Sequence, residues 1–591
     1  TSWPGQSGFR PLLMLTFAFN YMNGGLNPLN FRIINIFIHF LNAILIYFIL
    51  KNLIREFYGN KSSVSGDSKN VNFKNSENNK KEALLFFLTG IFTVHPVYTG
   101  TVIYISSRSD LMATFFILCG FLLYLANKSL PVLLLYIAAL LTKETGLCFG
   151  LLILTGDFIR TVNRRRKFRH CIKGKWLVYF GIFFISAGYF IYRNAINIPL
   201  PQGSTRSLLS NVLIQSAVTF LYLKLFLFPF ALNIIHYIPD LNSLSQPLSL
   251  ASVAGIATIL GLIFIFIKKS PLISIGLSWL IIGLLPKFYM RLTVVAMEYH
   301  FYFASIGIYM VLIALLKISR MEQRKYFSWI NGGVILLFAI LTILRGYEYR
   351  DPLLFWQVAK ARNPHDITIR FNLAETYYQK GLYEQAINEI GFIVAVEKEA
   401  FDVYLLSGNV YYGKGDIDSA FVSYSKAVRL NPESSEAYSN LGVIYKRWGQ
   451  RSQAYEAFKE ALRLNPYLWV AYSGLADCYM EERLFREAAD YYKQALKLNP
   501  DEEVLYIKTG KAFFSLGDYK EALDYFYKVF DMNFSSVEAL EYIGMIYGNM
   551  GKFDEAIEVF RGALKIDPTN ERMEKNILKA KSLKELIGNG K

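Results

Sequence analysis

Apolar residues form long runs through the first half of the chain and are scattered more thinly through the second half. A helix needs about 20 mainly apolar residues to cross a lipid bilayer. Ten runs approach that length, at roughly 31–50, 83–101, 109–126, 130–142, 145–161, 176–192, 249–267, 271–287, 299–317 and 326–344. The pattern predicts ten membrane-spanning helices within residues 1–345 and a polar domain after them.

A further apolar segment, at about 207–230, fits two arrangements because it carries Lys224 and ends at Pro229. Lys and Arg are retained in the cytoplasmic loops of membrane proteins. The basic loops here are 51–82, 164–175, 268–269 and 317–325. All four loops lie on the same side of the membrane only if residues 207–230 do not cross it. We therefore expect this segment not to cross, and residues 1–30 and the C-terminal half to lie outside the cytoplasm of a bacterial or endoplasmic-reticulum type membrane.

The chain begins TSWPGQSGFRP, without an initiator Met or a signal peptide. A chain that begins outside the cytoplasm needs a preceding segment that carried it across the membrane. We expect the sequence to be truncated, with at least one upstream helix missing.

The second half repeats with a period of 34 residues. Ala386, Ala420, Ala454, Ala488, Ala522 and Ala556 share one register, and Gly381, Gly415, Gly449, Gly517 and Gly551 share another, with Arg483 as its exception. A helix-turn-helix of this period, with small residues where helices touch, is the tetratricopeptide pattern. We expect six repeats over about 366–568, after a linker or partial repeat helix at 346–365 and before a capping helix and tail at 569–591.

Each such repeat buries its apolar face only against its neighbours, which produces a superhelix with a concave groove suited to an extended peptide. The expected fold is therefore all-α, a polytopic helical membrane domain followed by a tetratricopeptide superhelix. Protein or peptide and membrane lipid are the expected partners.

Composition narrows the class of protein further. Hydrophobic residues make up 53% of the chain and charged residues 18%, with a mean hydropathy of +0.27, which argues against a purely cytosolic enzyme. The net charge of +17 comes from short basic runs between apolar stretches, so nucleic acid is not an expected partner. The four cysteines are scattered, without a CxxC pair. No disulfide framework, metal site or cofactor is therefore predicted.

Ionisable residues near the expected non-cytoplasmic ends of the spans form the candidate site. They are Arg10, His95, Arg108, Asp110, Lys143, Glu144, Arg291, Glu298 and His300. Such residues are costly at membrane depth and often mark functional sites. The alternative is structural, as interfacial anchors or, for Arg108 with Asp110, as a local ion pair. Mixed acids, Arg, Lys and His beside apolar helices can hold a lipid-linked phosphate while a carboxylate removes an acceptor proton.

One polar stripe favours a structural role instead. Asn35, His39 and Asn42 lie on one face of the first span, as expected for packing between helices.

Four short motifs add a resemblance to a known family. They are Arg10-Pro11-Leu12, FTVHPVY at 92–98 with SRSDL at 107–111, Thr142-Lys143-Glu144, and MEYHFYFASIG at 297–307. In this order, with the repeats behind them, they resemble the transmembrane and tetratricopeptide-repeat O-mannosyltransferases and their prokaryotic relatives. The chain departs from the family at Ala304, where relatives tend to have Pro, and in the order of Tyr299 and His300. The family's acidic pair, expected just before Arg10, is absent.

The resemblance implies a GT-C type membrane glycosyltransferase. Such an enzyme transfers a sugar, typically mannose, from a polyprenyl phosphate to Ser or Thr hydroxyls outside the cytoplasm, with inversion, and its repeats present the protein acceptor. The donor is a substrate and not a cofactor.

Residues matching the family motifs receive candidate roles. Asp110, Glu144 and Glu298 are the candidate catalytic acids, with no general base assigned. Arg10, His95, Arg108 and Lys143 are the candidate phosphate ligands. Arg108 is our first choice, because a guanidinium binds two phosphate oxygens at once.

Two other classes of protein compete. A non-catalytic membrane-anchored scaffold would need only one anchoring helix, so ten spans with charges on one face count against it. A transporter would be expected to place its polar site at mid-membrane on broken helices, whereas the charges here lie near helix ends.

Overall fold

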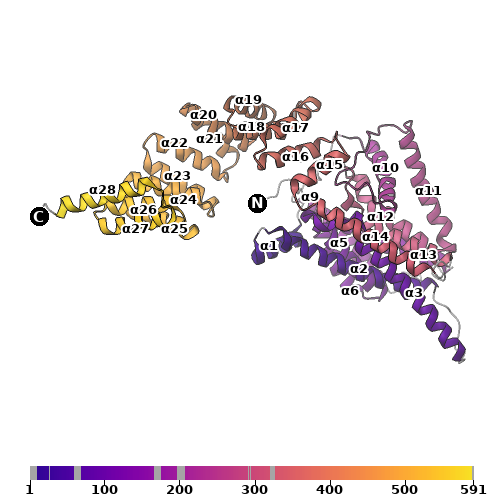
Figure 1. Cartoon of the computed structure of the whole chain (residues 1–591). Coiled ribbons are helices and arrows are strands. Elements are labelled where there is room, and N and C mark those ends of the chain that lie inside the picture. Colours follow the sequence, from indigo (N-terminus) through magenta and orange to yellow (C-terminus); the bar gives the residue numbers. More distant parts are fainter. Residues whose placement is uncertain are drawn as a thin grey trace. The chain divides into compact units, whose positions relative to one another are not determined.

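The computed structural model describes residues 10–25, 27–58, 68–164, 175–195, 206–290, 292, 294–319 and 326–588. Helices and no strands occur in this part of the chain, which confirms the all-α expectation. The chain divides into two compact units, Thr1–Ile369 and Arg370–Lys591 (Figure 1). The parts of the predicted basic loops at 59–67, 165–174 and 320–325 lie outside the described residues.

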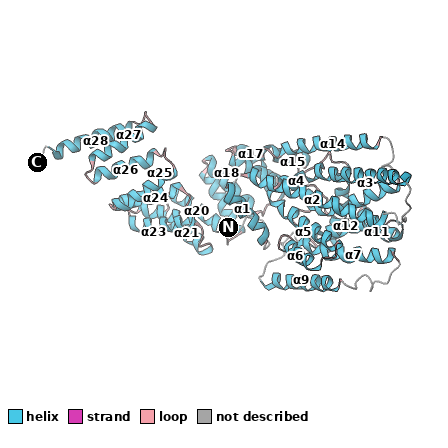
Figure 2. Ribbon diagram, turned by 90° about the horizontal axis from the view of Figure 1, so that it is seen from below, coloured by secondary structure: helices cyan, strands magenta, loops and turns pink. Residues whose placement is uncertain are grey.

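The first unit is a bundle of helices that run lengthwise beside one another (Figure 2). Its α-helices are α1 (Pro11–Gly24), α2 (Pro28–Tyr58), α3 (Ser68–Val94), α4 (Thr99–Ile103), α5 (Arg108–Leu125), α6 (Ser129–Leu140), α7 (Cys148–Asn163), α9 (Trp176–Ala195), α10 (Leu208–Leu227), α11 (Pro247–Lys269), α12 (Pro271–Tyr289), α13 (Tyr302–Ile318), α14 (Phe327–Glu348) and α15 (Pro352–Arg362). Short 3-10 turns precede several of them: η1 (Pro96–Tyr98), η2 (Ile105–Ser107), η3 (Glu144–Leu147) and η4 (Glu298–Phe301).

Eight helices in the described ranges are long and apolar enough to cross a membrane, or nine if a bent pair counts as one span. The bent pair is the predicted span 83–101, which turns by 42° at a break between Val94 and Pro96. Pro96 has no backbone N–H and disfavours a helical conformation at His95, whose φ of −70° and ψ of 124° are extended. Apolar helices corresponding to predicted spans 130–142 and 176–192 are present but shorter, at Ser129–Leu140 and Trp176–Tyr192.

The helix α10 qualifies as a membrane span by length and composition. Its first turn, however, contacts the end of α12, and its last turn contacts the residue that follows α3. Near its start, the Asn211 amide donates to the carbonyls of Lys287 and Phe288, where α12 finishes. Near its end, the Phe226 carbonyl lies 2.9 Å from His95 Nε2, just after α3. The turn η4 contacts both α12 and η1, so these two places share one end of the bundle. This geometry favours the predicted non-crossing arrangement.

Small residues bring the helices of the bundle together. A Cβ added to Gly276 on α12 would lie 2.5 Å from the carbonyl oxygen of Gly307 on α13, and one added to Gly283 would lie 2.8 Å from Cα of Ala304. Close backbone approach at small residues is typical of helix pairs in membranes. It fixes the end of α12 against the start of α13, where the predicted site residues lie.

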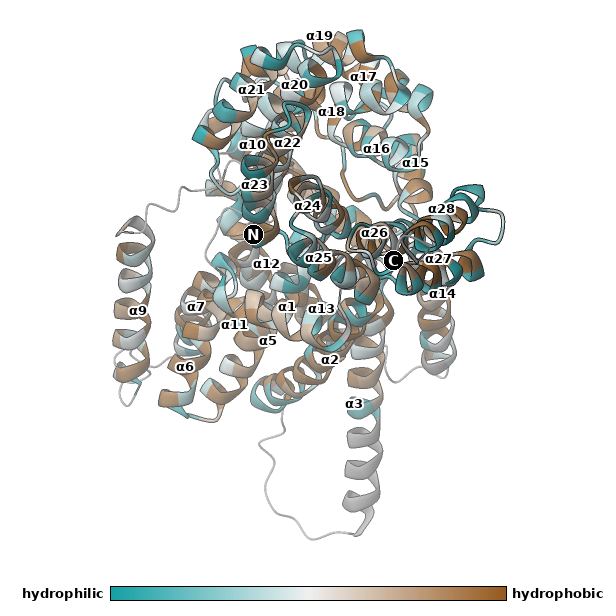
Figure 3. Cartoon of the chain, turned by 90° about the vertical axis from the view of Figure 1, so that its left-hand side faces the viewer, coloured by the Kyte–Doolittle hydropathy of each residue, from teal (hydrophilic) through white to brown (hydrophobic). Residues whose placement is uncertain are grey.

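The second unit contains helices in consecutive antiparallel pairs, beginning with α16, whose first three residues belong to the first unit. They are α16 (Ile367–Gln379), α17 (Tyr383–Val396), α18 (Phe401–Lys414), α19 (Ile417–Leu430), α20 (Ser435–Arg447), α21 (Arg451–Leu464), α22 (Trp469–Glu481), α23 (Phe485–Leu498), α24 (Glu503–Leu516), α25 (Tyr519–Met532), α26 (Val537–Asn549), α27 (Phe553–Ile566) and the terminal α28 (Glu571–Gly588). Figure 3 shows teal, hydrophilic positions along α23, α25 and α28 and mostly brown ones along α2 and α6.

The turns between paired helices explain the glycine register. Gly415 closes α18 and Gly517 closes α24 with positive φ angles of 90° and 83°. Only glycine adopts this left-handed conformation without a steric penalty. Arg483 occupies the same place in its repeat with a φ of 62°, so the turn is kept although the glycine is not.

Candidate active site at one end of the helix bundle

Several helix ends and turns meet at one end of the first unit, which we call the polar end. The turn η3 contacts the start of α5 and α12, and η4 contacts α12, η1 and α4. The acids Asp110 and Glu144 lie in the first turns of α5 and η3, and Glu298 lies in the first turn of η4. Helix N-termini favour negative charge, and here they bring three predicted acids to one region.

Two ion pairs form the centre of the polar end. Lys143 Nζ lies 2.5 Å from Asp110 Oδ2, and Arg10 Nη2 lies 3.5 Å from Glu144 Oε2. The side chains of Lys143 and Asp110 are 9% and 8% exposed, so their pair is almost sealed from water. Lys287 lies within electrostatic range of all four. We call these five residues the lysine cluster.

Sequence analysis did not select Lys287. It lies in the last turn of α12, directly after Pro286, and it is half-buried. A detectable signal was present, because Lys287 is the one charged residue of Pro271–Tyr289 and ionisable residues inside apolar helices are functional candidates.

Two aromatic rings of η4 border the lysine cluster. Lys143 Nζ lies 5.7 Å from the ring centroid of Tyr299, a distance suited to a cation–π contact. The His300 ring lies edge-on to Tyr299, with the centroids 4.5 Å apart. His300 is buried, and its Nδ1 atom has no hydrogen-bond partner among the described residues. His300 thus offers an unused polar atom beside the cluster.

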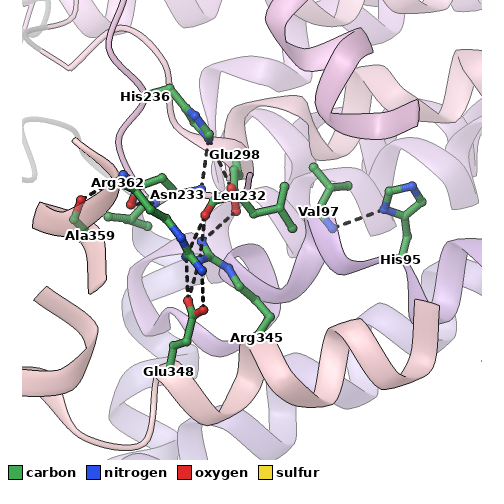
Figure 4. Close-up of polar contacts among 11 residues, drawn as sticks. His95, Val97, Leu232, Asn233, His236, Glu298, Arg345, Glu348, Ala359 and Arg362 are labelled. Carbon is green, nitrogen blue, oxygen red and sulfur yellow. Dashed lines mark hydrogen bonds and ion pairs between the residues drawn. The ribbon is translucent and has the colours of Figure 1, made fainter. Parts of the chain in front are cut away.

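A second group of charges lies beside the first and is shown in Figure 4. We call His236, Glu298, Arg345, Glu348 and Arg362 the junction cluster. Glu298 is 1% exposed, with Oε1 3.2 Å from His236 Nε2 and Oε2 3.4 Å from Arg345 Nη2. Arg345 also pairs with Glu348 at 2.6 Å. Glu298 is thereby held by a histidine and an arginine that sequence analysis did not assign to the site.

The junction cluster ties α15 to the rest of the first unit. Arg362 at the end of α15 bonds Glu348 at 2.6 Å, and both Arg345 and Arg362 donate to the carbonyl of Leu232. The Asn233 amide donates to the carbonyl of Ala359 on α15. The predicted linker 346–365 therefore contains an ordered helix, fastened to η4 through Glu298.

The hydrogen bonds of Arg108 go to residues outside both clusters. Arg108 is completely buried, and its guanidinium donates to Asn35 Oδ1 at 2.8 Å, Asn20 Oδ1 at 2.6 Å and the Phe31 carbonyl at 2.9 Å. These acceptors belong to α1 and α2. Asp110 pairs with Lys143 and not with Arg108, so the local ion pair considered from the sequence is absent. The contacts of Arg108 favour a structural role, and phosphate binding by it stays a prediction.

His95 is also occupied by the fold. Its Nε2 lies 2.9 Å from the Phe226 carbonyl, and its Nδ1 accepts a hydrogen bond from the Val97 backbone N–H. The ring stacks on Phe226 with centroids 4.6 Å apart, and Figure 4 shows it apart from the junction cluster. Its contacts favour fixing the break between α3 and η1, and its role as a phosphate ligand stays a prediction.

The predicted polar stripe on α2 joins helices, as expected. His39 Nδ1 lies 2.7 Å from the Tyr302 hydroxyl, and the Asn42 amide donates to the Leu111 carbonyl. Asn35 accepts from Arg108 and donates to the Val102 carbonyl. Arg291 lies outside the described residues. No group of three or more His, Cys, Asp or Glu that could hold a metal ion occurs in the part of the chain that the structure describes.

Fold and site together define a polytopic, all-helical membrane protein that carries tetratricopeptide repeats and a buried charged cluster at one bundle end. Family models for the repeats match this chain directly. The model described as "TPR repeat" matches 408–449, and models described as "Tetratricopeptide repeat" match 435–468, 469–502, 505–536 and 537–570.

The similar curated proteins are named protein O-mannosyl-transferases. TMTC4 of Mus musculus is 25% identical over 443 residues, which cover 65% of this chain and 57% of that protein. Tmtc1 of Drosophila melanogaster is 25% identical over 173 residues, covering 28% of this chain and 17% of that protein. The matches to the first relatives thus span less than two thirds of their lengths. These names confirm the resemblance found in the motifs.

Solved structures are similar over a smaller part of the chain. The structure titled "Crystal structure of MamA" is 27% identical with a TM-score of 0.26, covering 28% of this chain and 96% of that one. The type IV pilus biogenesis factor PilW is 20% identical with a TM-score of 0.34, covering 35% of this chain and 97% of that one.

Proposed function

We propose that this chain is a membrane glycosyltransferase that transfers mannose from a polyprenyl-phosphate donor to Ser or Thr hydroxyls of proteins on the non-cytoplasmic face of the membrane. The observation that carries the proposal is the similarity over 65% of the chain to a protein O-mannosyl-transferase. The lysine cluster supports it, because charged groups at a bundle end beside apolar helices suit a ligand that is part lipid and part phosphate.

The lysine cluster receives the donor phosphate in this proposal. Lys143 and Arg10 supply positive charge, while Asp110 and Glu144 hold these cations in place through the two ion pairs. Both carboxylates are thus already engaged by cations of the protein. We therefore give Asp110 and Glu144 an orienting role and assign no general base among the described residues.

Glu298 acts in the proposal as a positioning residue. It starts the turn that carries Tyr299 and His300 to the lysine cluster. Its carboxylate is held by Arg345, which also bonds Glu348 near α15. The acceptor protein is bound by the repeats, whose groove suits an extended chain.

The activity is tested by transfer of radiolabelled mannose from polyprenyl phosphate to a Ser/Thr-rich peptide. The enzyme is the natural full-length protein purified in lipid nanodiscs. Transfer above a heat-inactivated control supports the proposal. Absence of transfer with every polyprenyl-phosphate sugar offered, from folded protein, would favour a non-catalytic scaffold.

The role of the repeats is tested separately by deleting residues 370–591, the second compact unit. We expect peptide glycosylation to weaken while donor binding stays close to that of the intact protein, because the proposed donor contacts all lie in the first unit. Equal loss of both would make the repeats structural.

The proposed sidedness has its own test. A protease site inserted in the exposed turn at Arg350 should be cut from the non-cytoplasmic face of sealed vesicles, because we expect α14 to end there. Cutting only from the cytoplasmic face would reverse the assignment.

A further inference from the structure

The helices α5 and α7 begin at the polar end, and the opposite end of the bundle, where they finish, holds another buried group of charges. We call it the basic end. Asp157 of α7 is buried, and its Oδ2 atom accepts hydrogen bonds from the hydroxyls of Tyr124 and Tyr179. Lys175 Nζ lies 3.3 Å from the same oxygen, and Arg160 Nη1 lies 3.0 Å from Oδ1. One carboxylate thus joins α5, α7 and α9 and fixes the position of Lys175.

The basic end has more positive than negative charge. Glu56 on α2 lies 3.1 Å from Arg160 Nε and 2.9 Å from Arg164 Nη2, so three cations share two carboxylates. Arg160 Nη2 is buried without a hydrogen-bond partner among the described residues. Residues 165–174, which join α7 to α9, include five Lys or Arg and no Asp or Glu, and residues 59–79 include three Lys, one Asp and one Glu. Neither segment can bring the net charge of this end to zero.

A small pocket opens beside Lys175, where the turn between α5 and α6 meets the start of α9. Its lining residues are Tyr124, Asn127, Lys128, Ser129, Lys175 and Val178. The pocket has a volume of about 20 Å³, and a cavity of this size holds one water-sized atom. It therefore suits a single oxygen of a larger group whose remaining atoms lie outside.

The polar groups around the pocket are donors. The Lys128 ammonium is exposed and makes no ion pair or hydrogen bond with any described residue. Lys175 Nζ contacts Tyr124 and Asp157, and an ammonium has three N–H groups. The helix α6 begins at Ser129 without a side-chain cap, which leaves its first backbone N–H groups beside the same turn. Two lysines from separate segments and a helix N-terminus favour an anion here.

The surroundings of the pocket indicate that this anion belongs to a lipid. The apolar helices α6 and α9 lie side by side and both begin at the pocket (Figure 2). Leu130 and Leu134 on α6 are exposed, as are Trp176 and Phe180 on α9. Exposed apolar side chains on helices of a membrane bundle face acyl chains, and Trp is typical of the interface with water. The pocket is therefore at the depth of the lipid headgroups.

We propose that this pocket binds the phosphate of an anionic phospholipid through Lys128 and Lys175, with the acyl chains along α6 and α9. The inference goes beyond the proposed function and does not depend on it. A zwitterionic phospholipid also carries an amine, but Asp157 and Glu56 are already paired with cations. A net negative headgroup is therefore favoured. We expect this end to be cytoplasmic because of its basic loops, and the cytoplasmic leaflet contains anionic lipids.

The test uses the full-length protein in phosphatidylcholine nanodiscs. The probes are phosphatidylglycerol and phosphatidylcholine that carry the same photoreactive diazirine on one acyl chain, each added at the same mole fraction. After illumination, mass spectrometry of peptides measures labelling of residues 129–140 and 175–192. A parallel sample contains excess soluble inorganic phosphate, which separates a lipid headgroup from free phosphate as the ligand.

The variants are Lys128→Gln and Lys128→Arg, since Lys175 also pairs with Asp157. Lys269→Gln is the matched control, because Lys269 is exposed at the same end of the bundle but outside the pocket. The next residue, Ser270, has its hydroxyl 2.9 Å from that of Tyr58, which ends α2 close to Glu56. The control removes the same charge from the same membrane face.

We expect the phosphatidylglycerol probe to label the wild type about fivefold more than the phosphatidylcholine probe, and Lys128→Gln to remove most of this preference. Lys128→Arg and Lys269→Gln should keep it, and inorganic phosphate should not reduce it. Equal labelling of the wild type by the two probes overturns the inference, and this comparison needs no variant to fold.

Two further outcomes also overturn the inference. Equal losses in Lys128→Gln and Lys269→Gln would mean that the whole basic surface attracts anionic lipid and that the pocket is not a site. Displacement of the probe by inorganic phosphate would make free phosphate the ligand.

Discussion

The two charged clusters at the polar end differ in how their charges balance. In the junction cluster, Glu298 and Glu348 face Arg345 and Arg362, so two negative charges meet two positive ones. Counted over its five named residues alone, the lysine cluster has three cations and two carboxylates. Both are largely buried, and both join segments distant in sequence. Burial and pairing alone therefore do not separate a structural cluster from a binding site.

Charge balance does separate them. A balanced buried cluster is complete within the protein, and a ligand would have to displace one of its own partners. An unbalanced cluster gains from binding a counter-charge, because that ligand relieves an unfavourable buried charge. We expect changes in the junction cluster to act on stability first, and changes in the lysine cluster to act on donor binding first.

The largest expected effect is loss of stability on replacing Arg345 by Gln. Glu298, which is 1% exposed, would then keep His236 as its remaining ion-pair partner among the described residues. Breaking a buried ion pair by removing one partner destabilises proteins by roughly 3–5 kcal/mol. Thermal unfolding of the purified protein should show a clear drop in Tm. Arg350→Gln is the control, because Arg350 is exposed.

A double variant refines this result. Glu298→Gln with Arg345→Gln removes both charges and should recover part of the lost stability. If Arg345→Gln keeps the wild-type Tm and instead abolishes donor binding, the junction cluster belongs to the binding site and the contrast between the clusters fails.

Arg108 gives the next largest effect and decides between the sequence-based and structural interpretations. Arg108→Ala leaves Asn35 and Asn20 without their charged donor and should lower the free energy of unfolding by about 2–4 kcal/mol. Arg108→Lys should also destabilise, because an ammonium cannot reach all of these acceptors. Folded Arg108→Ala protein should still bind donor. Normal stability with donor binding lost would restore Arg108 as the phosphate ligand.

The repeats were the part of the fold most open to prediction from sequence. Their period of 34 residues is local, so each turn and each helix contact recurs at a fixed spacing. Even Arg483 could be placed in the register by its neighbours, and it takes the same positive φ as the glycines. In residues 1–345, by contrast, the sequence pattern shows only where apolar runs are long enough to cross a membrane. The break at His95–Pro96 therefore divided a segment that hydropathy alone showed as one span.

The sequence predicted which charged residues lie in the candidate site, but not which of them contact one another. Sorting the charged residues by helix end grouped Asp110, Lys143 and Glu144, and Lys143 does pair with Asp110. The partners in each ion pair could not be predicted from the sequence, because they are distant along the chain. Lys143 and Asp110 are 33 residues apart, and Arg345 and Glu298 are 47 residues apart. Arginine is a common phosphate ligand, so the sequence alone favoured Arg108. The structure shows that the Arg108 guanidinium already donates hydrogen bonds to acceptors on α1 and α2.

Arg10 should show a smaller effect, on binding more than on stability. Its pair with Glu144 is long, at 3.5 Å, and its side chain is 19% exposed, so Arg10→Gln should change the free energy of unfolding by about 1 kcal/mol or less. Donor affinity should fall about tenfold, which corresponds to about 1.4 kcal/mol. Arg10→Lys should restore part of it. Titration of labelled donor checks this, and unchanged affinity would remove Arg10 from the phosphate site.

The smallest expected effect comes from the repeats, where a paired carboxylate is partly open to water. Asp477 contacts Lys446 at 2.5 Å, Lys508 at 2.9 Å and the Tyr492 hydroxyl at 2.6 Å. Burial opposes its ionisation, but Lys508 and Lys446 outweigh burial and hold the pKa of Asp477 below its ordinary value. The stabilisation is therefore complete above the unfolded pKa of about 3.9 and is lost as the pH falls through the lower folded value.

Asp477→Asn tests this pH dependence without touching the membrane half. The variant should lose at most about 1 kcal/mol at neutral pH, and its stability should fall less steeply than that of the wild type when the medium is acidified below about pH 4. Hydrogen exchange in α22, corrected for intrinsic rates and measured in the full chain, reports the local change. Identical acid sensitivity in both proteins would mean that the pair is energetically neutral. Balanced charge would then stabilise this protein only where water is excluded, as in the junction cluster.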